Sequence, residues 1–249
     1  MTIKLGIISD PISGFNIKKD TGFAMMEEAQ KRGYELHYME MDDLFLRQGQ
    51  AFATSAKAKV FNDAKHWYEL EEKQTIALAD LDVILMRKDP PFDTEYIYAT
   101  YILERAEQAG TLVINKPQSL RDANEKLFTA WFSEFTPDTL VTRSQQQIRH
   151  FLAEHGDIII KPLDGMGGAS IFRVKAEDQN LNVILETLTQ FGNQTIMAQK
   201  YLPEITDGDK RVLVVDGEVI PFCLARIPSG NDFRGNLAAG GQGEVRPLS

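Results

Sequence analysis

The stretch that decides the fold is Lys161-Pro162-Leu163-Asp164-Gly165-Met166-Gly167-Gly168-Ala169-Ser170-Ile171-Phe172-Arg173. Three glycines lie between two runs of residues that are typical of β-strands, 157–161 and 170–174. Glycine tolerates positive φ and lets a ligand approach the backbone. Consecutive N–H groups in such a turn can form an anion-binding concavity, to which Lys161 adds a cation. An ordinary hairpin turn is the alternative interpretation. Because three glycines exceed what a hairpin needs, the stretch favours a phosphate-binding loop.

Two other phosphate-binding motifs do not fit this loop. The Walker motif needs a lysine directly after its last glycine and a helix after that, and no lysine follows here. The dinucleotide fingerprint spaces its glycines G-x-G-x-x-G between a strand and a helix. The spacing here is G-x-G-G, and a strand follows. A glycine-rich loop between antiparallel strands is typical of kinases and ATP-grasp enzymes, but the kinase motifs H-R-D and D-F-G are absent.

The composition limits the classes of function. A chain of 249 residues with 43% apolar and 25% charged residues predicts a soluble globular protein of two or three lobes. A net charge of −9 argues against nucleic acid as a main partner. No apolar run approaches the roughly 18 residues of a membrane span, and the amino terminus lacks a signal-peptide pattern. The single cysteine, Cys223, excludes an internal disulfide and favours a reducing cytoplasm. The four histidines lack metal-site spacing.

The first half of the chain alternates predicted strands and helices. Strands are expected at 3–9, 34–39, 81–86 and 111–114, with one helix between residue 20 or 21 and Gly33 and another that Thr94 caps. This alternation predicts an α/β domain with a parallel sheet. The segment 48–79 is polar and weakly periodic, so we expect an excursion at the sheet edge.

The second half predicts an α+β arrangement with mostly antiparallel sheets. Asp216-Gly217 between two apolar runs is a strong hairpin signal. The expected helices are 119–132, 144–155 and one through Leu181, Leu185 and Leu188; the expected strands are 157–161, 170–174, 195–201, 211–215 and 218–227.

Several charged residues are candidates for a binding site. Lys126 and Lys161 could clamp phosphate oxygens, although Lys126 taken alone is better explained as part of a solvated helix face. The strand end 199–202 could read an adenine edge, and alone it is an ordinary strand end. Arg226 ends an apolar strand, and Arg234 lies in the glycine-rich stretch 228–243, which is either disordered or a lid.

The expected chemistry follows from these residue types. Guanidinium groups such as that of Arg211 bind carboxylates and phosphates bidentately. Neither paired carboxylates nor a Ser-His-Asp set is evident. The sequence therefore predicts catalysis by positioning and electrostatics rather than by a protein nucleophile.

Nearly the whole chain resembles the bacterial glutathione synthetases, which are ATP-grasp ligases. The matching stretches are 86–93 (MRKDPPFD), 115–122 (NKPQSLRD), 161–173 and 234–241 (RGNLAAGG). The resemblance implies a Rossmann-like, parallel-sheet pre-ATP-grasp domain (1–118) for substrate binding and oligomerisation. An ATP-grasp fold with antiparallel sheets follows, divided into a lid subdomain with the glycine-rich loop (119–204) and the start of the C-terminal subdomain (205–249). The last part of that fold, with the Mg²⁺ ligands, is expected beyond Ser249, so no metal ligand is expected in this chain.

The resemblance also implies the reaction. γ-Glutamylcysteine and glycine would be joined to form glutathione through an acyl phosphate, with release of ADP and phosphate. The alternatives are another ATP-grasp carboxylate–amine ligase, or a nucleotide-binding fragment that does not turn over. The family further implies a cytoplasmic homo-oligomer, typically a tetramer.

The resemblance assigns roles to individual residues. The expected ATP-binding residues are Lys126, Lys161, Gly165, Met166, Gly167, Gly168, Gln199, Lys200, Tyr201, Leu202 and Asp209. Arg226 and Arg211 are the expected catalytic residues. The expected substrate contacts are Lys18, Arg87, Arg226, Arg234 and Asn236.

Overall fold

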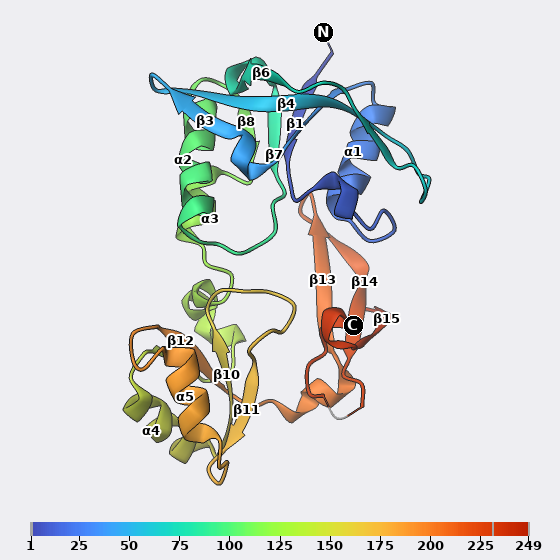
Figure 1. Ribbon diagram of the computed structural model, residues 1–249. Helices are drawn as coiled ribbons and strands as arrows, with labels where there is room; N and C mark the ends of the chain where they lie inside the picture. Colours follow the sequence, from blue (N-terminus) through green and yellow to red (C-terminus); the bar gives the residue numbers. More distant parts are fainter. Residues whose placement is uncertain (1, 231, 249) are drawn as a thin grey trace. The chain divides into compact units, whose positions relative to one another are not determined.

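The computed structural model describes residues 2–230 and 232–248, which divide into two units (Figure 1). Unit 1 is Met1–Ala123 and unit 2 is Asn124–Ser249. Each unit has its own sheets and its own apolar core. No helix in the described part of the chain is long and apolar enough to cross a membrane.

The four strands expected in the first half form the parallel part of the sheet in unit 1. Their order is β2-β1-β7-β8, and each neighbouring pair is parallel. This confirms the predicted α/β class. Their bounds are β1 (Lys4–Ile8), β2 (Glu35–Met39), β7 (Val83–Met86) and β8 (Leu112–Ile114).

The segment 48–79 is not a polar excursion, because it forms further strands of the same sheet. β4 pairs antiparallel with β2, so the sheet is mixed rather than purely parallel. The buried face of β4 carries small side chains such as Ala51, Ala53 and Ser55, which weaken the two-residue hydrophobic period in the sequence. The strands of this part are β3 (Leu44–Arg47), β4 (Gln50–Val60), β5 (Tyr68–Leu70) and β6 (Gln74–Ala77).

Two helices cover opposite faces of the sheet in unit 1. Phe23 and Met26 of α1 (Thr21–Lys31) belong to the cluster that contains Leu5 and Ile7 of β1. Residues of α2 (Thr94–Gln108) belong to the other cluster, with Ile8. Alternate residues of β1 therefore face different helices, as expected for a strand that is buried on both sides.

Both helices begin at an aspartate cap. Asp20 accepts a hydrogen bond from the Phe23 N–H at 2.9 Å, as the sequence allowed. The cap of α2 is Asp93 rather than the predicted Thr94, because the Asp93 carboxylate accepts from the Tyr96 N–H at 2.9 Å.

A four-stranded antiparallel sheet forms the first part of unit 2. Its order is β11-β10-β12-β9, and α4 and α5 pack on one face only. The other face is left for the cavity described below. The bounds are β9 (Thr139–Thr142), α4 (Gln145–His155), β10 (Asp157–Pro162), β11 (Phe172–Lys175), α5 (Leu181–Thr189) and β12 (Ile196–Lys200).

The helix predicted at 119–132 is wrong. The chain forms α3 (Pro117–Asp122), breaks at Ala123, and continues as the 3₁₀ segment η4 (Leu127–Phe135). The Asn124 side-chain oxygen accepts from the N–H groups of Lys126 (3.0 Å) and Leu127 (2.9 Å). Such local bonds compete with a continuous helix.

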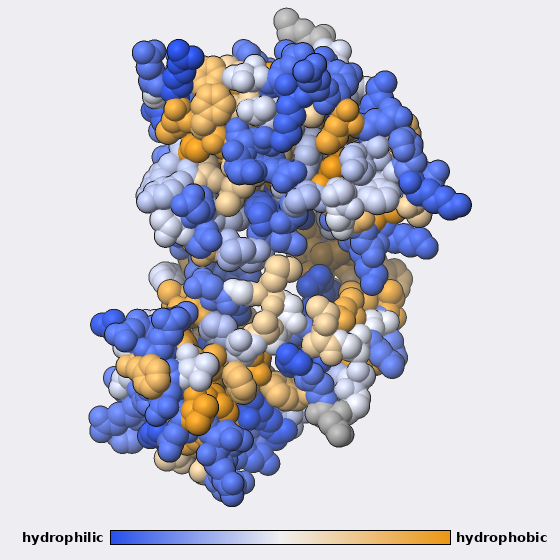
Figure 2. All heavy atoms as spheres, viewed as in Figure 1, coloured by the Kyte–Doolittle hydropathy of each residue, from blue (hydrophilic) through white to orange (hydrophobic). Residues whose placement is uncertain are grey.

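A three-stranded antiparallel sheet, in the order β13-β14-β15, ends unit 2. Asp216 (φ 51°) and Gly217 (φ 80°) form its first turn, which confirms the predicted hairpin. β15 (Gln242–Pro247) was not predicted. Apolar side chains are exposed over this sheet (Figure 2): Val212, Leu213, Val214, Val215, Val219, Ile220, Phe222 and Val245. The remaining elements are β13 (Asp209–Val215), β14 (Glu218–Ile227), and the 3₁₀ segments η1 (Ile12–Gly14), η2 (Met41–Asp43), η3 (Leu78–Asp80), η5 (Pro203–Asp207) and η6 (Leu237–Ala239).

Candidate functional site

A cavity of about 260 Å³ lies in unit 2 over the sheet face that α4 and α5 leave uncovered. Eight of the predicted site residues line it: Lys161, Gln199, Lys200, Tyr201, Leu202, Asp209, Arg234 and Asn236. The sequence analysis did not identify the other six lining residues: Pro137, Ile159, Ile171, Ile205, Phe233 and Gly235.

Strand β10 determines which residues lie at each end of this cavity. Ile158 and Ile160 point into the apolar core, whereas Ile159 and Lys161 line the cavity. β12 runs antiparallel, so Gln199 lies beside Ile159. The glycine-rich loop therefore follows the Lys161 end of β10, and the strand end with Tyr201 lies at the other end. The alternation along 157–161 was the sequence signal that could have identified Ile159.

The Lys161 ammonium group is half-buried and available to a ligand. Among the described residues, no carboxylate or other hydrogen-bond acceptor contacts it. Burial, and then the nearby positive charge of Lys126, lower the pKa of Lys161. A partly desolvated ammonium group without a counter-ion, at the edge of a cavity, is suited to binding an anion.

Lys126 stabilises the glycine-rich loop and does not line the cavity. Its ammonium group donates to the carbonyl oxygens of Leu163 at 3.2 Å and Gly165 at 2.9 Å. Gly165 (φ 90°), Gly167 (φ 69°) and Gly168 (φ 84°) all have positive φ, so the loop adopts a conformation that other residues rarely tolerate.

The glycine-rich loop also contacts the stretch 228–243. The Arg234 guanidinium group donates to the Gly168 carbonyl oxygen at 2.9 Å. A Cβ atom at Gly168 would lie 2.7 Å from the Asn236 side-chain oxygen. Arg234 is also paired with Asp232 at 2.6 Å, and this pairing lowers the pKa of Asp232 to about 2. The two loops are thus held together, but only the second one, through Arg234 and Asn236, lines the cavity, and the predicted residues 165–168 do not.

Arg226 and Asp209 are partners rather than separate site residues. They lie opposite each other on β14 and β13, and the Arg226 Nε donates to Asp209 Oδ1 at 2.8 Å, with a second contact between Nη2 and Oδ2. The pairing raises the pKa of Arg226. Asp209 lines the cavity, whereas Arg226 does not. Arg211 is exposed opposite Leu224 and does not line the cavity.

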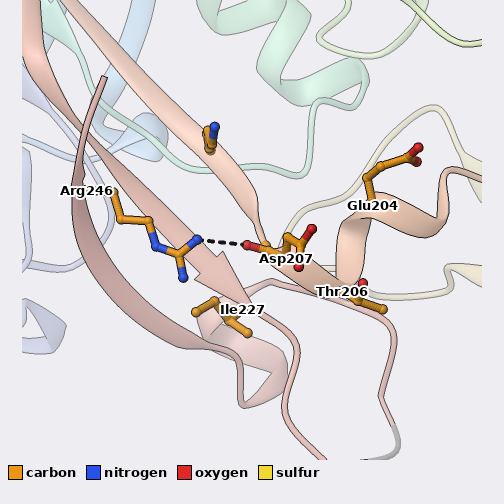
Figure 3. A pocket seen from close by; sticks show the side chains of 7 residues that line it. Glu204, Thr206, Asp207, Ile227 and Arg246 are labelled. Atoms are coloured by element: carbon orange, nitrogen blue, oxygen red, sulfur yellow. Dashed lines mark hydrogen bonds between the residues drawn. The ribbon is translucent and has the colours of Figure 1, made fainter. Parts of the chain in front are cut away.

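A second cavity of about 560 Å³ contains none of the predicted residues (Figure 3). It lies on the other face of β13, because Lys210 alternates with Asp209 along the strand. Arg246 donates to the Asp207 carbonyl oxygen at 3.1 Å, and the Glu204 carboxylate points away from that guanidinium group in Figure 3. Its lining is Glu204, Thr206, Asp207, Gly208, Lys210, Ile227 and Arg246.

Lys18 and Arg87 lie in unit 1, in the loops after β1 and β7. β2 lies on one side of β1 and β7 lies on the other, so the strand order reverses its direction at β1. Open α/β sheets bind ligands in the crevice at such a reversal. Asp10 links the two loops through Lys88 Nζ (2.8 Å) and the Asp89 N–H (2.9 Å). Lys18 and Arg87 are both exposed.

Both halves of the chain match the same protein family. Residues 3–121 match the family described as prokaryotic glutathione synthetase, N-terminal domain, and residues 125–249 match the ATP-grasp domain of the same family. A glutathione synthetase of Salmonella typhimurium (strain LT2) is 69% identical over 247 residues, which are 99% of this chain and 78% of the relative. One of Vibrio vulnificus (strain YJ016) is 66% identical over 249 residues, with coverage of 100% and 78%.

Solved structures resemble the chain in fold. D-cycloserine synthetase DcsG superposes with a TM-score of 0.62 at 14% identity, covering 90% of this chain and 68% of that one. The ATP-grasp ligase PsnB with a minimal precursor gives 0.58 at 20% identity, with coverage of 100% and 78%. These similarities confirm the predicted ATP-grasp fold.

Proposed function

Because this chain belongs to the prokaryotic glutathione synthetase family and is an ATP-dependent ligase that forms glutathione, we propose that the cavity of unit 2 binds ATP. One observation supports this most directly. The cavity is lined at one end by the uncompensated ammonium group of Lys161, which the glycine-rich loop follows in the chain, and at the other end by the strand end with Tyr201. These two different ends suit a nucleotide whose triphosphate lies at Lys161 and whose base lies at 199–202.

Residues around the phosphate end have distinct roles in the proposal. Lys161 contacts the phosphates, and the backbone of 165–168, including Met166, covers them. Lys126 holds the loop through its carbonyl groups and reaches the phosphates when the loop reorganises around ATP. Asp209 lines the nucleotide cavity and orients Arg226.

The substrates that we propose are γ-glutamylcysteine and glycine. The γ-phosphoryl group of ATP passes to the cysteinyl carboxylate, and ADP leaves. The glycine amine then attacks the acyl carbon and loses a proton, and the C–O bond to phosphate breaks. Arg226 and Arg211 stabilise the charge that develops, and Arg234 and Asn236 close over the intermediate.

We propose that unit 1 contributes Lys18 and Arg87 to dipeptide binding. Both are exposed cations at the carboxyl edge of the parallel strands. The γ-glutamyl group carries a free carboxylate, for which a guanidinium group is a suitable partner. The link through Asp10 holds the Arg87 loop beside β1.

ATP-grasp ligases typically use Mg²⁺, which one or two carboxylates together with the phosphates of a nucleotide can hold. Among residues 2–230 and 232–248, no three His, Cys, Asp or Glu side chains gather where they could hold a metal ion. We propose Mg²⁺ only as the counter-ion that accompanies the ATP phosphates.

The family also suggests how the chain is organised. We propose the division into 1–118, 119–204 and 205–249, with a homo-oligomer, typically a tetramer, formed largely through the first part. A cytoplasmic location is consistent with the single, buried Cys223.

The test of this function is substrate-dependent ADP release. With the purified protein, ADP should form only when ATP, γ-glutamylcysteine and glycine are all present with Mg²⁺, and glutathione should appear in a 1:1 ratio with ADP. D-alanine and glutamate in place of glycine test other carboxylate–amine ligases. ADP release that does not respond to omission of either substrate would overturn the proposal. ATP binding without any product would instead support a nucleotide-binding fragment.

Gly168→Ala should lower kcat/KM for ATP about tenfold. The added methyl group would lie 2.7 Å from the Asn236 side-chain oxygen, at a backbone φ of 84° that costs alanine roughly 1 kcal/mol. Steady-state kinetics at varied ATP measures the change. Gly156→Ala is the matched control, since Gly156 has φ 73° but no neighbour within 4 Å of the new Cβ. Equal kinetics for the two variants would show that contact between the loops is unimportant.

A further inference from the structure

We propose that Arg173 is a positioning residue for the nucleotide base: together with Asp157 it holds the Tyr201 ring as a fixed wall at the base end of the cavity. This inference rests on the proposed ATP site. Neither Arg173 nor Asp157 lines the cavity itself. They act through Tyr201, which does.

The register of three strands brings the group together. Arg173 of β11 lies opposite Ile159 of β10, on the face toward the cavity. Asp157 lies two residues before Ile159 on the same face, and the Tyr201 N–H donates to the Asp157 carbonyl oxygen at 3.1 Å. The three side chains are therefore cross-strand and diagonal neighbours, which is the spacing at which long side chains meet.

The contacts use two different surfaces of the guanidinium group. Its edge donates to the Asp157 carboxylate, with Nε to Oδ1 at 3.0 Å and Nη2 to Oδ2 at 2.6 Å. Its Cζ lies 3.6 Å from the centroid of the Tyr201 ring. The ion pair fixes the plane of the guanidinium group, and that plane covers one face of the ring.

The position along β10 connects this group to the base rather than to the phosphates. Lys161, Ile159 and Asp157 alternate along one face, and two residues of a strand span roughly 6.6 Å. Asp157 therefore lies roughly 13 Å from Lys161 along the strand. A cation at this distance from the glycine-rich loop is poorly placed for the phosphates. Held still, the Tyr201 ring presents a flat surface on which a base can stack without loss of rotamer freedom.

A double-mutant cycle on the full chain tests the proposal. ATP binding is measured by calorimetry for the wild type, Arg173→Met, Tyr201→Leu and the double variant. Arg173→Met should weaken ATP binding about three- to tenfold in the wild-type background, in line with the usual strength of a cation–π contact. In the Tyr201→Leu background the same change should weaken binding less than about twofold, because the ring that Arg173 holds is gone.

Two further variants separate positioning from charge. Arg173→Lys keeps the charge but loses the planar group, so it should not restore wild-type affinity. Arg149→Met removes an arginine of α4, which contacts Asn182, and should bind ATP as the wild type does. Kinetically, Arg173→Met should raise KM for ATP and leave kcat unchanged.

The outcomes are distinguishable. Additive effects in the cycle, or full rescue by Arg173→Lys, would overturn the role of Arg173, provided that the wild type binds ATP. Wild-type protein that fails to bind ATP would overturn the proposed ATP site instead. Circular dichroism and the unfolding temperature show whether each variant is folded. If Arg173→Met does not fold, the cycle is measured with Arg173→Lys in its place.

Discussion

Lys161→Met is expected to weaken ATP binding about ten- to hundredfold while leaving the unliganded protein at least as stable as the wild type. Loss of a hydrogen-bonded charge costs roughly 1.5–3 kcal/mol, which corresponds to that range of affinity. The unliganded protein gains because the ammonium group is partly desolvated and has no counter-ion among the described residues. Calorimetry gives the affinity, and thermal unfolding with and without ATP gives the stability.

Lys210→Met is the matched control for this prediction. Lys210 is an exposed lysine whose side chain lies on the opposite face of β13 from Asp209. Its replacement should change neither the ATP affinity nor the shift in unfolding temperature that ATP causes. If Lys161→Met destabilised the unliganded protein while ATP affinity stayed unchanged, Lys161 would be a structural residue and not a ligand for phosphate.

The lowered pKa of Lys161 adds a dependence on pH to the same prediction. Above its lowered value and below about 10.5, the unfolded chain holds a proton that the folded chain has lost, so the contribution of Lys161 to stability rises with pH across this window. ATP affinity falls across the same window because the ammonium charge is lost. The Lys161→Met variant should lack both changes.

Arg226→Met is expected to lower kcat at least about a hundredfold with little change in KM for ATP. Removal of one group that stabilises developing charge commonly costs about 10²–10³ in kcat. Asp209→Asn should lower kcat as well, because the carboxylate that orients the guanidinium group is gone. The double variant should resemble Arg226→Met alone. Steady-state kinetics at saturating ATP provides the measurement.

Arg246→Met is the control for Arg226. Arg246 lies on the neighbouring strand β15, where it contacts Glu244 and the Asp207 carbonyl oxygen beside the second cavity. Its loss should leave kcat within about twofold. A large rise in KM for ATP with unchanged kcat in Arg226→Met would show that Arg226 contributes to nucleotide binding rather than to acyl transfer.

Much of the fold could be predicted because local signals agreed with the tertiary structure. The hairpin at Asp216-Gly217 and the cap at Asp20 are examples in which a few adjacent residues determine the geometry. Prediction failed where the signal was small or competed with another. Alanines and Ser55 obscured β4, and the side chain of Asn124 interrupts a segment with helical spacing. β15 begins at the end of the glycine-rich stretch 228–243 and lacks an apolar alternation.

The site was predictable to the extent that it lies in continuous segments. The strand end 199–202 and Lys161 lie on neighbouring strands, and the motifs that contain them indicated the cavity. Pairings between distant residues were not predictable, because they depend on register. The pairing of Arg226 with Asp209, and the contact of Arg173 with Tyr201, each need a specific alignment of two strands.

Because β10 faces the core on one side and the cavity on the other, a change in its length affects both. Its isoleucines Ile158 and Ile160 lie in the core, and Ile159 and Lys161 line the cavity. A single-residue insertion before Ile159 would exchange these faces, placing an ammonium group in the core and an isoleucine where phosphate is expected. An insertion in β10 is therefore expected to disturb the core and the cavity together, whereas a substitution at Ile159 or Lys161 changes the cavity alone.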